Sequence, residues 1–321
     1  MRRQTYWWRL LITACLFLLA ASSAQADIDP AVVQKLLADD KAAEDAFGYK
    51  VSVNGDTAVI GVPNADPDSL SEAGAAYIFI RSDGIWTQQA KLTASDKAAE
   101  DWFGIGVSVS GDTVVIGASL ADPDSLEDAG AAYVFTRSDG IWIQQAKLTA
   151  DDKAGYDCFG ASISVSGETA MIGAPSADPD SLSGAGAVYI FTRSDDGIWT
   201  QQTKLTAGDK TAEDQFGISM SVDGDTAVIG SPSADPNSLP YAGAAYVFTR
   251  SDGTWTQQAK LTADDKAEND RFGGAVDVDG DTAVIGAPSA DPDGLSSAGA
   301  AYVYDVSATI KDMPWIRVLL L

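Results

Sequence analysis

The sequence predicts an all-β protein made of five copies of one unit of four antiparallel strands. A segment of the form Asp-x-Phe-Gly occurs five times, and each copy is followed about a dozen residues later by a run such as Asp-Thr-Ala-Val-Ile-Gly. The copies follow one another at intervals of 56, 56, 57 and 56 residues. A fixed period of this length indicates stacked supersecondary units rather than one irregular domain. The repeated pairs are Phe47-Gly48, Phe103-Gly104, Phe159-Gly160, Phe216-Gly217 and Phe272-Gly273.

Residues 1–26 have the pattern of a secretory signal peptide. Three arginines precede an apolar run from Leu10 to Ala21, and a small-residue cleavage motif follows at residues 24–26. The apolar run is shorter than the ~20 residues that a membrane-spanning helix needs. We therefore expect cleavage before Asp27, no membrane span, and a mature protein that is secreted, periplasmic or on the cell surface.

The composition excludes several classes of function. Loss of the signal peptide removes three arginines from a chain with 21 basic and 46 acidic residues, and leaves a net charge of −28. Nucleic acid is excluded as a natural partner, because binding it requires basic side chains that neutralise phosphates. The chain has no histidine, so the commonest general base and zinc ligand is absent. Cys158 alone remains after cleavage, so an internal disulfide cannot form.

The second unit illustrates the strands in order. Residues 106–110 alternate small, polar and apolar side chains, and a Ser-Gly-Asp turn leads to the β-rich run at residues 113–117. An acidic loop of ten residues then leads to the strand at 131–137, and a Ser-Asp-Gly turn to the amphipathic strand at 141–148. Inner strands that are apolar on both faces, with an outer strand half in water, are the pattern of a β-propeller blade.

The two ends of the repeat array complement each other. Residues 31–37 align with the outer strand of a unit, with Lys35 matching Lys91, yet they precede the first unit. The fifth unit departs from the repeat after Tyr304 and lacks an outer strand. We therefore expect residues 31–37 to complete the fifth blade and close the ring, which would remove open sheet edges. The propeller is predicted to occupy residues 27–304, and residues 305–321 form an unassigned tail.

These motifs resemble the FG-GAP repeat family, whose best-known members form the N-terminal propeller of integrin α subunits. The resemblance rests on the Asp-x-Phe-Gly segments, the Gly-Ala-Pro segments at 173–175 and 286–288, and the period. It extends from Asp39 to about Tyr304 and implies a bacterial, secreted propeller that recognises an extracellular partner through loops on one face. The integrin propellers differ in having seven blades. Their calcium-binding loop is replaced here by tight turns such as residues 54–56, which lack the oxygens that calcium needs.

The long loops of every unit are expected on one face, because strand direction alternates. Their aspartates have two interpretations. Asp followed by Pro suits the start of a short helical turn, and acidic loops keep a β protein soluble. Calcium binding by carboxylates of one blade is the other hypothesis. The candidate metal ligands are Asp45, Asp66, Asp68, Asp122, Asp124, Asp178, Asp180, Asp291 and Asp293.

Three aromatic residues interrupt the repeat in these loops. Trp102 and Tyr156 lie before Phe-Gly pairs, and Tyr241 lies in an acidic loop where other units have polar or small residues. Aromatic side chains on an acidic surface are candidates for contacts with a partner. Packing beneath a loop is the alternative interpretation.

The sequence therefore predicts a monomeric, non-catalytic binding, adhesion or scaffold module for a protein or glycan partner. Some five-bladed propellers are glycosidases that use two carboxylates. Here nearly every acidic residue has a copy in the next unit, whereas catalytic acids are expected to stand apart from a repeat. A structural surface or matrix component, and a carbohydrate-active enzyme, are the alternative functions.

Overall fold

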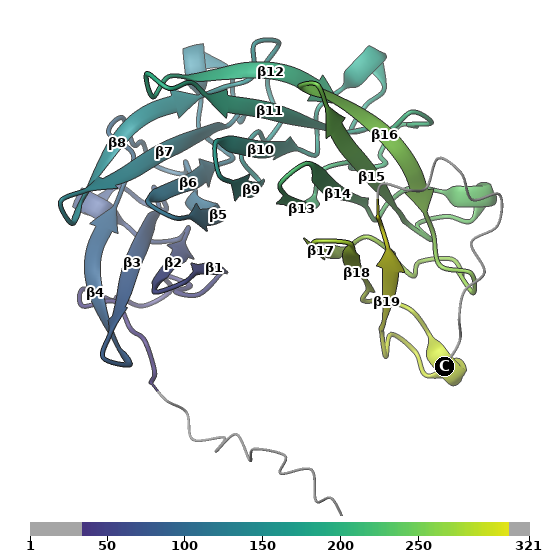
Figure 1. Ribbon diagram of the computed structural model, residues 1–321, viewed down its shortest axis with the longest axis horizontal. Coiled ribbons are helices and arrows are strands. Elements are labelled where there is room, and N and C mark those ends of the chain that lie inside the picture. Colours follow the sequence, from purple (N-terminus) through teal and green to yellow (C-terminus); the bar gives the residue numbers. More distant parts are fainter. Residues whose placement is uncertain (1–33, 308–321) are drawn as a thin grey trace, which may run out of the picture. The chain divides into compact units, whose positions relative to one another are not determined.

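Five antiparallel sheets make up the described part of the chain and follow one another in sequence, as the repeat predicts. The computed structural model describes residues 34–307, and within them nineteen strands form four sheets of four strands and one of three. The compact unit begins at Leu36. Figure 1 shows the sheets side by side, with the first strand of each toward the centre and the last strand outward. The predicted five-bladed propeller is confirmed.

The sheets are numbered here as blades 1 to 5. Blade 1 contains β1 (Lys50–Asn54), β2 (Thr57–Val62), β3 (Ala75–Ser82) and β4 (Ile85–Leu92). Blade 2 contains β5 (Phe103–Ser110), β6 (Thr113–Ala118), β7 (Ala131–Ser138) and β8 (Ile141–Leu148). Blade 3 contains β9 (Ser162–Ser166), β10 (Thr169–Ala174), β11 (Ala187–Arg193) and β12 (Trp199–Leu205). Blade 4 contains β13 (Ser219–Asp223), β14 (Thr226–Ser231), β15 (Ala244–Ser251) and β16 (Thr254–Leu261). Blade 5 contains β17 (Ala275–Asp279), β18 (Thr282–Ala287) and β19 (Ala300–Asp305).

Local sequence explains each strand and turn. The second strand of blade 2 is buried along its whole length, whereas the outer strand β8 alternates between exposed and buried positions. Two-residue turns join the first and second strands, with a glycine in the left-handed region, as at Gly55 (φ 58°). The turn after β3 places Asp83 and Gly84 at φ 51° and 79°, which is the backbone of the hairpin turns that match strand twist.

The hydrophobic core lies between blades. Val59 and Ile78 of blade 1 pack against Val107 and Val109 of blade 2, and the same positions meet at the following junctions. Phe103 is fully buried, with its ring 5.5 Å from that of Tyr133. Stacking therefore buries the apolar faces of blades that could not bury them alone.

Glycines set the spacing of the blades. A Cβ atom added at Gly61 of blade 1 would lie 2.0 Å from the carbonyl oxygen of Gly104 in blade 2. The equivalent distances at Gly117, Gly173 and Gly230 are 1.9, 2.3 and 2.0 Å. Only a residue without a side chain allows this approach of two backbones.

Blade 5 differs from the prediction of four strands. Its sheet has three strands in the described residues, and Gln34 to Leu37 belong to no strand. Residues 31–33, the other part of the expected closing strand, lie outside the described residues, as do the signal peptide and the tail from residue 308. Leu36 and Ala38 pack against blade 1. Closure of the ring thus stays a prediction.

A candidate recognition face formed by the long loops

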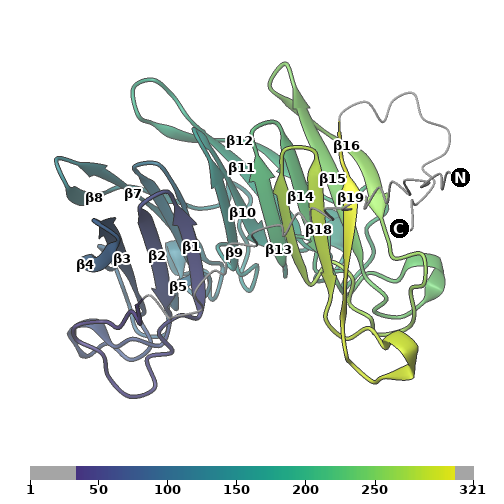
Figure 2. The same cartoon turned by 60° about the horizontal axis from the view of Figure 1, so that its bottom comes forward.

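Each blade is joined to the next by paired loops on one side of the molecule. The N–H groups of Glu100, Trp102 and Phe103 donate hydrogen bonds of 2.8, 3.1 and 3.1 Å to carbonyl oxygens of residues 71, 72 and 73. We call the side formed by these loops the loop face. It comprises residues 63–74, 119–130, 175–186, 232–243 and 288–299 together with 38–49, 93–102, 149–161, 206–218 and 262–274. Figure 2 shows these loops on the side opposite the hairpin turns, as the sequence predicted.

The paired loops hold non-glycine residues in the left-handed region. Glu100 and Trp102 have φ values of 70° and 58°, and the same conformation recurs at Tyr156 and Cys158. This backbone is strained for residues other than glycine. From blade 2 onward, hydrogen bonds to the preceding blade hold it in place, so these loops form a rigid surface. Cys158 is half-buried, and burial raises the pKa of its thiol.

The aspartate of each Asp-x-Phe-Gly segment stabilises its own loop. Asp45 is buried, and its Oδ2 accepts a hydrogen bond of 2.5 Å from the N–H of Ala42. Asp101 and Asp157 accept equivalent bonds from residues three positions earlier. Burial raises the pKa of Asp101, and the nearby Asp96 and Asp122 charges raise it further. These carboxylates fold the loop rather than face a ligand.

The aspartate before each proline closes the following loop. The Oδ1 of Asp66 accepts a 2.8 Å hydrogen bond from the N–H of Glu72, and Asp178 does the same for Gly184 at 2.8 Å. A short 3-10 turn begins at Pro67, as expected, but Asp66 makes no capping hydrogen bond to it. Asp66 thus occupies the N-cap position with Pro67 in the first turn, as the sequence predicts, but its side chain accepts a hydrogen bond from Glu72 instead of capping the turn. The remaining members of the set are Asp122, Asp235 and Asp291.

In blades 1 to 3 the second aspartate of the acidic loop pairs with a lysine of the next blade, whereas blade 4 has Asn237 at this position. Asp68 lies 3.0 Å from the Nζ of Lys97, and Asp124 lies 3.0 Å from the Nζ of Lys153. Asp180 forms the corresponding pair with Lys210. Asp293 in blade 5 forms no ion pair in the part of the chain that the structure describes.

Eight of the nine candidate metal ligands therefore have other partners in the described part of the chain, Asp293 being the exception. Within residues 34–307, no group of three or more acidic, cysteine or histidine side chains could hold a metal ion. The loop-closing and ion-pairing contacts account for the positions of these eight acids, and the calcium hypothesis gains no support from the geometry.

The three aromatic residues lie at separate junctions. The Nε1 of Trp102 donates a 3.0 Å hydrogen bond to Glu72 across the junction of blades 1 and 2. Tyr156 follows blade 2 and is 57% exposed, and Tyr241 in blade 4 is 46% exposed. The structure thus keeps all three on the loop face without bringing them into one cluster. Trp102 is only partly exposed, so packing beneath a loop describes it better than Tyr156 or Tyr241.

The sequence reasoning missed a polar cluster at the rim of the loop face. Asp40 accepts hydrogen bonds of 2.8 Å from the hydroxyl of Tyr77 and 2.6 Å from Nζ of Lys91. The Lys91 hydrogen bond lowers the pKa of Asp40, against the effect of burial. Tyr246 and Lys260 meet Asp209 in the same way. The signal in the sequence was the recurrence of a tyrosine 37 residues and a lysine 51 residues after this aspartate.

The opposite face carries paired charges. Arg81 forms a 2.7 Å salt bridge with Asp56 and lies 5.3 Å over the ring of Trp86. Arg137 and Arg250 repeat both contacts. Arg137 and Arg250 also donate hydrogen bonds to Thr57 and Thr169 of the preceding blade, so these arginines stabilise both their own blade and the junction before it.

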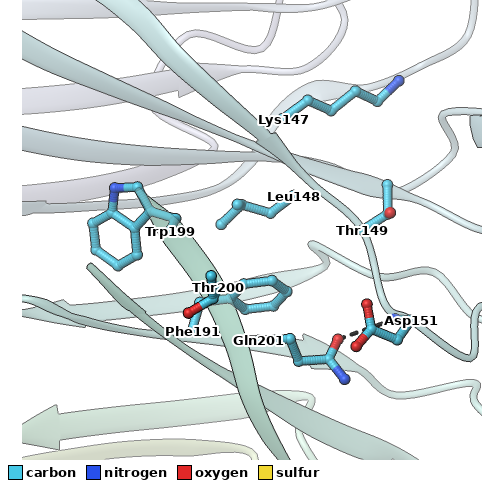
Figure 3. A pocket seen from close by; sticks show the side chains of 8 residues that line it. All are labelled: Lys147, Leu148, Thr149, Asp151, Phe191, Trp199, Thr200 and Gln201. Carbon is cyan, nitrogen blue, oxygen red and sulfur yellow. Dashed lines mark hydrogen bonds between the residues drawn. The ribbon is translucent and has the colours of Figure 1, made fainter. Parts of the chain in front are cut away.

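A polar depression of about 400 Å³ lies between the outer strands of blades 2 and 3. Figure 3 shows its lining, including the hydrogen bond between Asp151 and Gln201. The same contact joins Ser95 to Gln144 and Gly208 to Gln257. The depression is thus one copy of a repeated joint between blades. The lining residues are Lys147, Leu148, Thr149, Asp151, Phe191, Trp199, Thr200 and Gln201.

Comparison with known proteins agrees with this architecture. The family model described as FG-GAP repeat matches residues 31–79, 86–135, 142–191, 199–248 and 255–304. The chain is also similar to integrin alpha-6 from Gallus gallus, with 29% identity over 191 residues, which cover 55% of this chain and 17% of that protein. In residues 34–307 the structure contains no helix with the length and apolarity that crossing a bilayer requires. Because the family model matches more than half of the sequence in five consecutive copies, this chain belongs to the FG-GAP repeat family.

Proposed function

We propose that this propeller is a non-catalytic binding module whose loop face takes a protein or glycan partner outside the cell. Membership of the FG-GAP family and similarity to an integrin α chain support a binding role. The observation that carries the proposal is the position of Tyr156 and Tyr241. They are exposed aromatic residues that break the repeat, and both lie on the rigid loop face.

Rigid aromatic side chains supply contact area at low entropic cost, which is why they dominate binding energy at interfaces. Around them, the loop-face carboxylates favour a partner with positive charge. Association is then steered by electrostatic attraction and weakens as salt rises. The arginines of the opposite face are already paired with carboxylates and offer no equivalent attraction.

The test is a binding screen of the mature protein against a glycan array and against surface extracts from its native surroundings. Once a partner is found, Tyr156→Ala and Tyr241→Ala are expected to weaken binding by about 1 kcal/mol or more each. Arg81→Ala and Arg137→Ala on the opposite face serve as matched controls and are expected to change the affinity little. The reverse ranking would show that the partner binds the other face.

The screen also separates the alternative functions. A structural surface or matrix component would show no saturable binding to any fraction. A carbohydrate-active enzyme would hydrolyse glycans on the array and lose that activity when one acid is replaced. Export through the signal peptide of residues 1–26, which lie outside the described residues, is checked by locating the processed chain in cell fractions.

A further inference from the structure

The two ends of the propeller expose faces that are buried at every internal junction. We define the leading face as the surface of blade 1 that carries Val51 and Val53. The trailing face is the surface of blade 5 that carries Val284 and Val303. These four side chains are 67%, 66%, 42% and 70% exposed. In blade 2 the equivalents of Val51 and Val53 are Val107 and Val109, which are 7% and 5% exposed. In blade 1 the equivalents of Val284 and Val303 are Val59 and Ile78, which are both 0% exposed. These two buried pairs pack against each other at the first junction.

The polar groups of the two faces are complementary as well. At the first junction the N–H groups of Val109 and Gly111 donate to Ser52 Oγ at 3.2 Å and Asn54 Oδ1 at 3.0 Å. The same two bonds recur at the next three junctions. On the leading face the equivalent donors are the N–H groups of Val53 and Gly55. On the trailing face the equivalent acceptors are the side chains of Asp277 and Asp279, and Asp277 also accepts a 2.8 Å hydrogen bond from the hydroxyl of Ser221 in blade 4.

The loops at the two ends match in the same way. Glu44 and Ala46 have φ values of 70° and 59°, nearly those of Glu100 and Trp102, although no preceding blade holds them. The carbonyl groups of residues 296–298 in blade 5 occupy the positions that accept from such residues at the internal junctions. Lys41 and Asp293 are likewise the equivalents of the Lys97–Asp68 ion pair.

The backbone of each end already has the shape of an internal junction. A Cβ atom added at Gly286 would have its nearest neighbour in the same blade, the Cβ of Ala275 at 3.6 Å. A Cβ atom added at Gly48 would have no neighbour within 4 Å. Gly48 nevertheless keeps the φ of 94° that its equivalents use in contact with the preceding blade. Both ends are therefore preorganised for a junction that blades 1 and 5 of the same chain do not form here.

We propose that a second copy of this chain covers both faces, with the trailing face of each copy against the leading face of the other. The backbone contacts at Gly61, Gly117, Gly173 and Gly230 fix the angle at the internal junctions. Bringing blade 1 onto blade 5 of the same chain would require these junctions to change. Figure 1 shows blades 1 and 5 apart, with the gap between them open, so both end faces are accessible to a second copy, and a two-fold arrangement would place the trailing face of each copy on the leading face of the other. A head-to-tail interface that closes in this way gives a discrete dimer rather than a fibre.

This proposal departs from the monomer expected from the sequence and is tested by analytical ultracentrifugation over a wide concentration range. The wild-type chain is expected to form a dimer that dissociates on dilution. Val53→Asp on the leading face and Val303→Asp on the trailing face are each expected to weaken dimerisation about 100-fold or more, because they bury an unpaired charge. Both positions are exposed in one copy, so the variants are expected to fold. Ile143→Asp, at a 52% exposed position of the outer strand β8, is the matched control and leaves dimerisation unchanged.

A mixture of the two variants gives the sharper result. The copy with Val303→Asp keeps an intact leading face, and the copy with Val53→Asp keeps an intact trailing face. One wild-type junction can therefore form between them, and a heterodimer is expected although neither variant dimerises alone. A wild-type chain that sediments as a monomer at all concentrations would overturn the proposal. So would unchanged dimers in both variants, or a mixture without heterodimer. Monomers throughout, with melting temperatures lowered by both variants, would instead show closure of the chain on itself.

Discussion

Replacing Gly117 by alanine tests whether glycine-to-carbonyl contacts hold the blades at their spacing. Gly117 lies in β6, and an added Cβ would be 1.9 Å from the carbonyl oxygen and 2.8 Å from the carbonyl carbon of Gly160 in blade 3. The Gly160 backbone cannot move away freely, because its N–H donates a 2.9 Å hydrogen bond to Gly173. Blades 2 and 3 must therefore separate locally or strain their strands.

The expected cost follows from two opposing effects. Overpacking of a well-packed interior costs typically about 1–3 kcal/mol and occasionally more, and a contact this close belongs at the upper end. Alanine recovers about 0.4–1 kcal/mol by restricting the unfolded chain. The net loss of unfolding free energy is about 2 kcal/mol. At about 2–4 °C per kcal/mol for a domain of this size, the melting temperature falls by about 4–8 °C.

The assay is urea and thermal unfolding followed by far-ultraviolet circular dichroism and tryptophan fluorescence. Gly286→Ala is the matched control, since it makes the same change in blade 5 where the nearest atoms lie 3.6 Å away in its own blade. At a dilution where the chain is monomeric, the control is expected to unfold at or slightly above the wild-type midpoint. Equal midpoints for Gly117→Ala and wild type would refute the argument that these contacts set the blade spacing.

Three further predictions concern the loops and the ends. Asp178→Ala is expected to lower the unfolding free energy by about 1 kcal/mol, whereas Asp178→Asn keeps the acceptor that closes the loop and is expected to have an unfolding free energy near that of wild type. If calcium raises the melting temperature of wild type and of neither variant, Asp178 instead belongs to a metal site. The pKa of Asp40 is lowered in the fold, so its contribution to the free energy of unfolding is present above the unfolded pKa near 4 and is lost as pH falls through the folded pKa. Asp40→Asn is therefore expected to lower the urea midpoint at neutral pH and to flatten the fall of that midpoint in acid. Parallel curves of midpoint against pH for the variant and wild type would exclude a stabilising role of the Asp40 carboxylate. If residues 27–37 contain the outer strand of blade 5, their deletion exposes a sheet edge and should cause aggregation or a lower melting temperature. An unchanged melting temperature and an unchanged assembly state after that deletion would exclude this strand.

Much of the loop face could be foreseen from the repeat, and its contacts could not. The alternation of strand direction placed Trp102, Tyr156 and Tyr241 on one side, and the structure agrees. The hydrogen-bond partners of these residues depend on which loops of neighbouring blades come into contact. The hydrogen bond from Trp102 to Glu72 could therefore not be predicted from the sequence. The sequence predicted the N-cap position of Asp66 before Pro67, but not that its side chain accepts a hydrogen bond from Glu72, six residues further on, instead of capping the turn.

The sequence alone determined the number of blades, the four strands of blades 1 to 4 and the side on which the long loops lie. These features follow from short-range chemistry, namely the period of the apolar residues, the Gly-Asp and Asp-Gly turns, and the exact recurrence of the unit. Only the tertiary structure decided how the blades meet and whether the ends meet at all. The spacing of blades depends on backbone contacts such as Gly61 with Gly104, and the exposure of Val53 and Val303 depends on the sum of all junction angles. The sequence of one repeat does not specify the sum of the angles between successive blades. The open ends and the complementarity between them are therefore visible only in the tertiary structure.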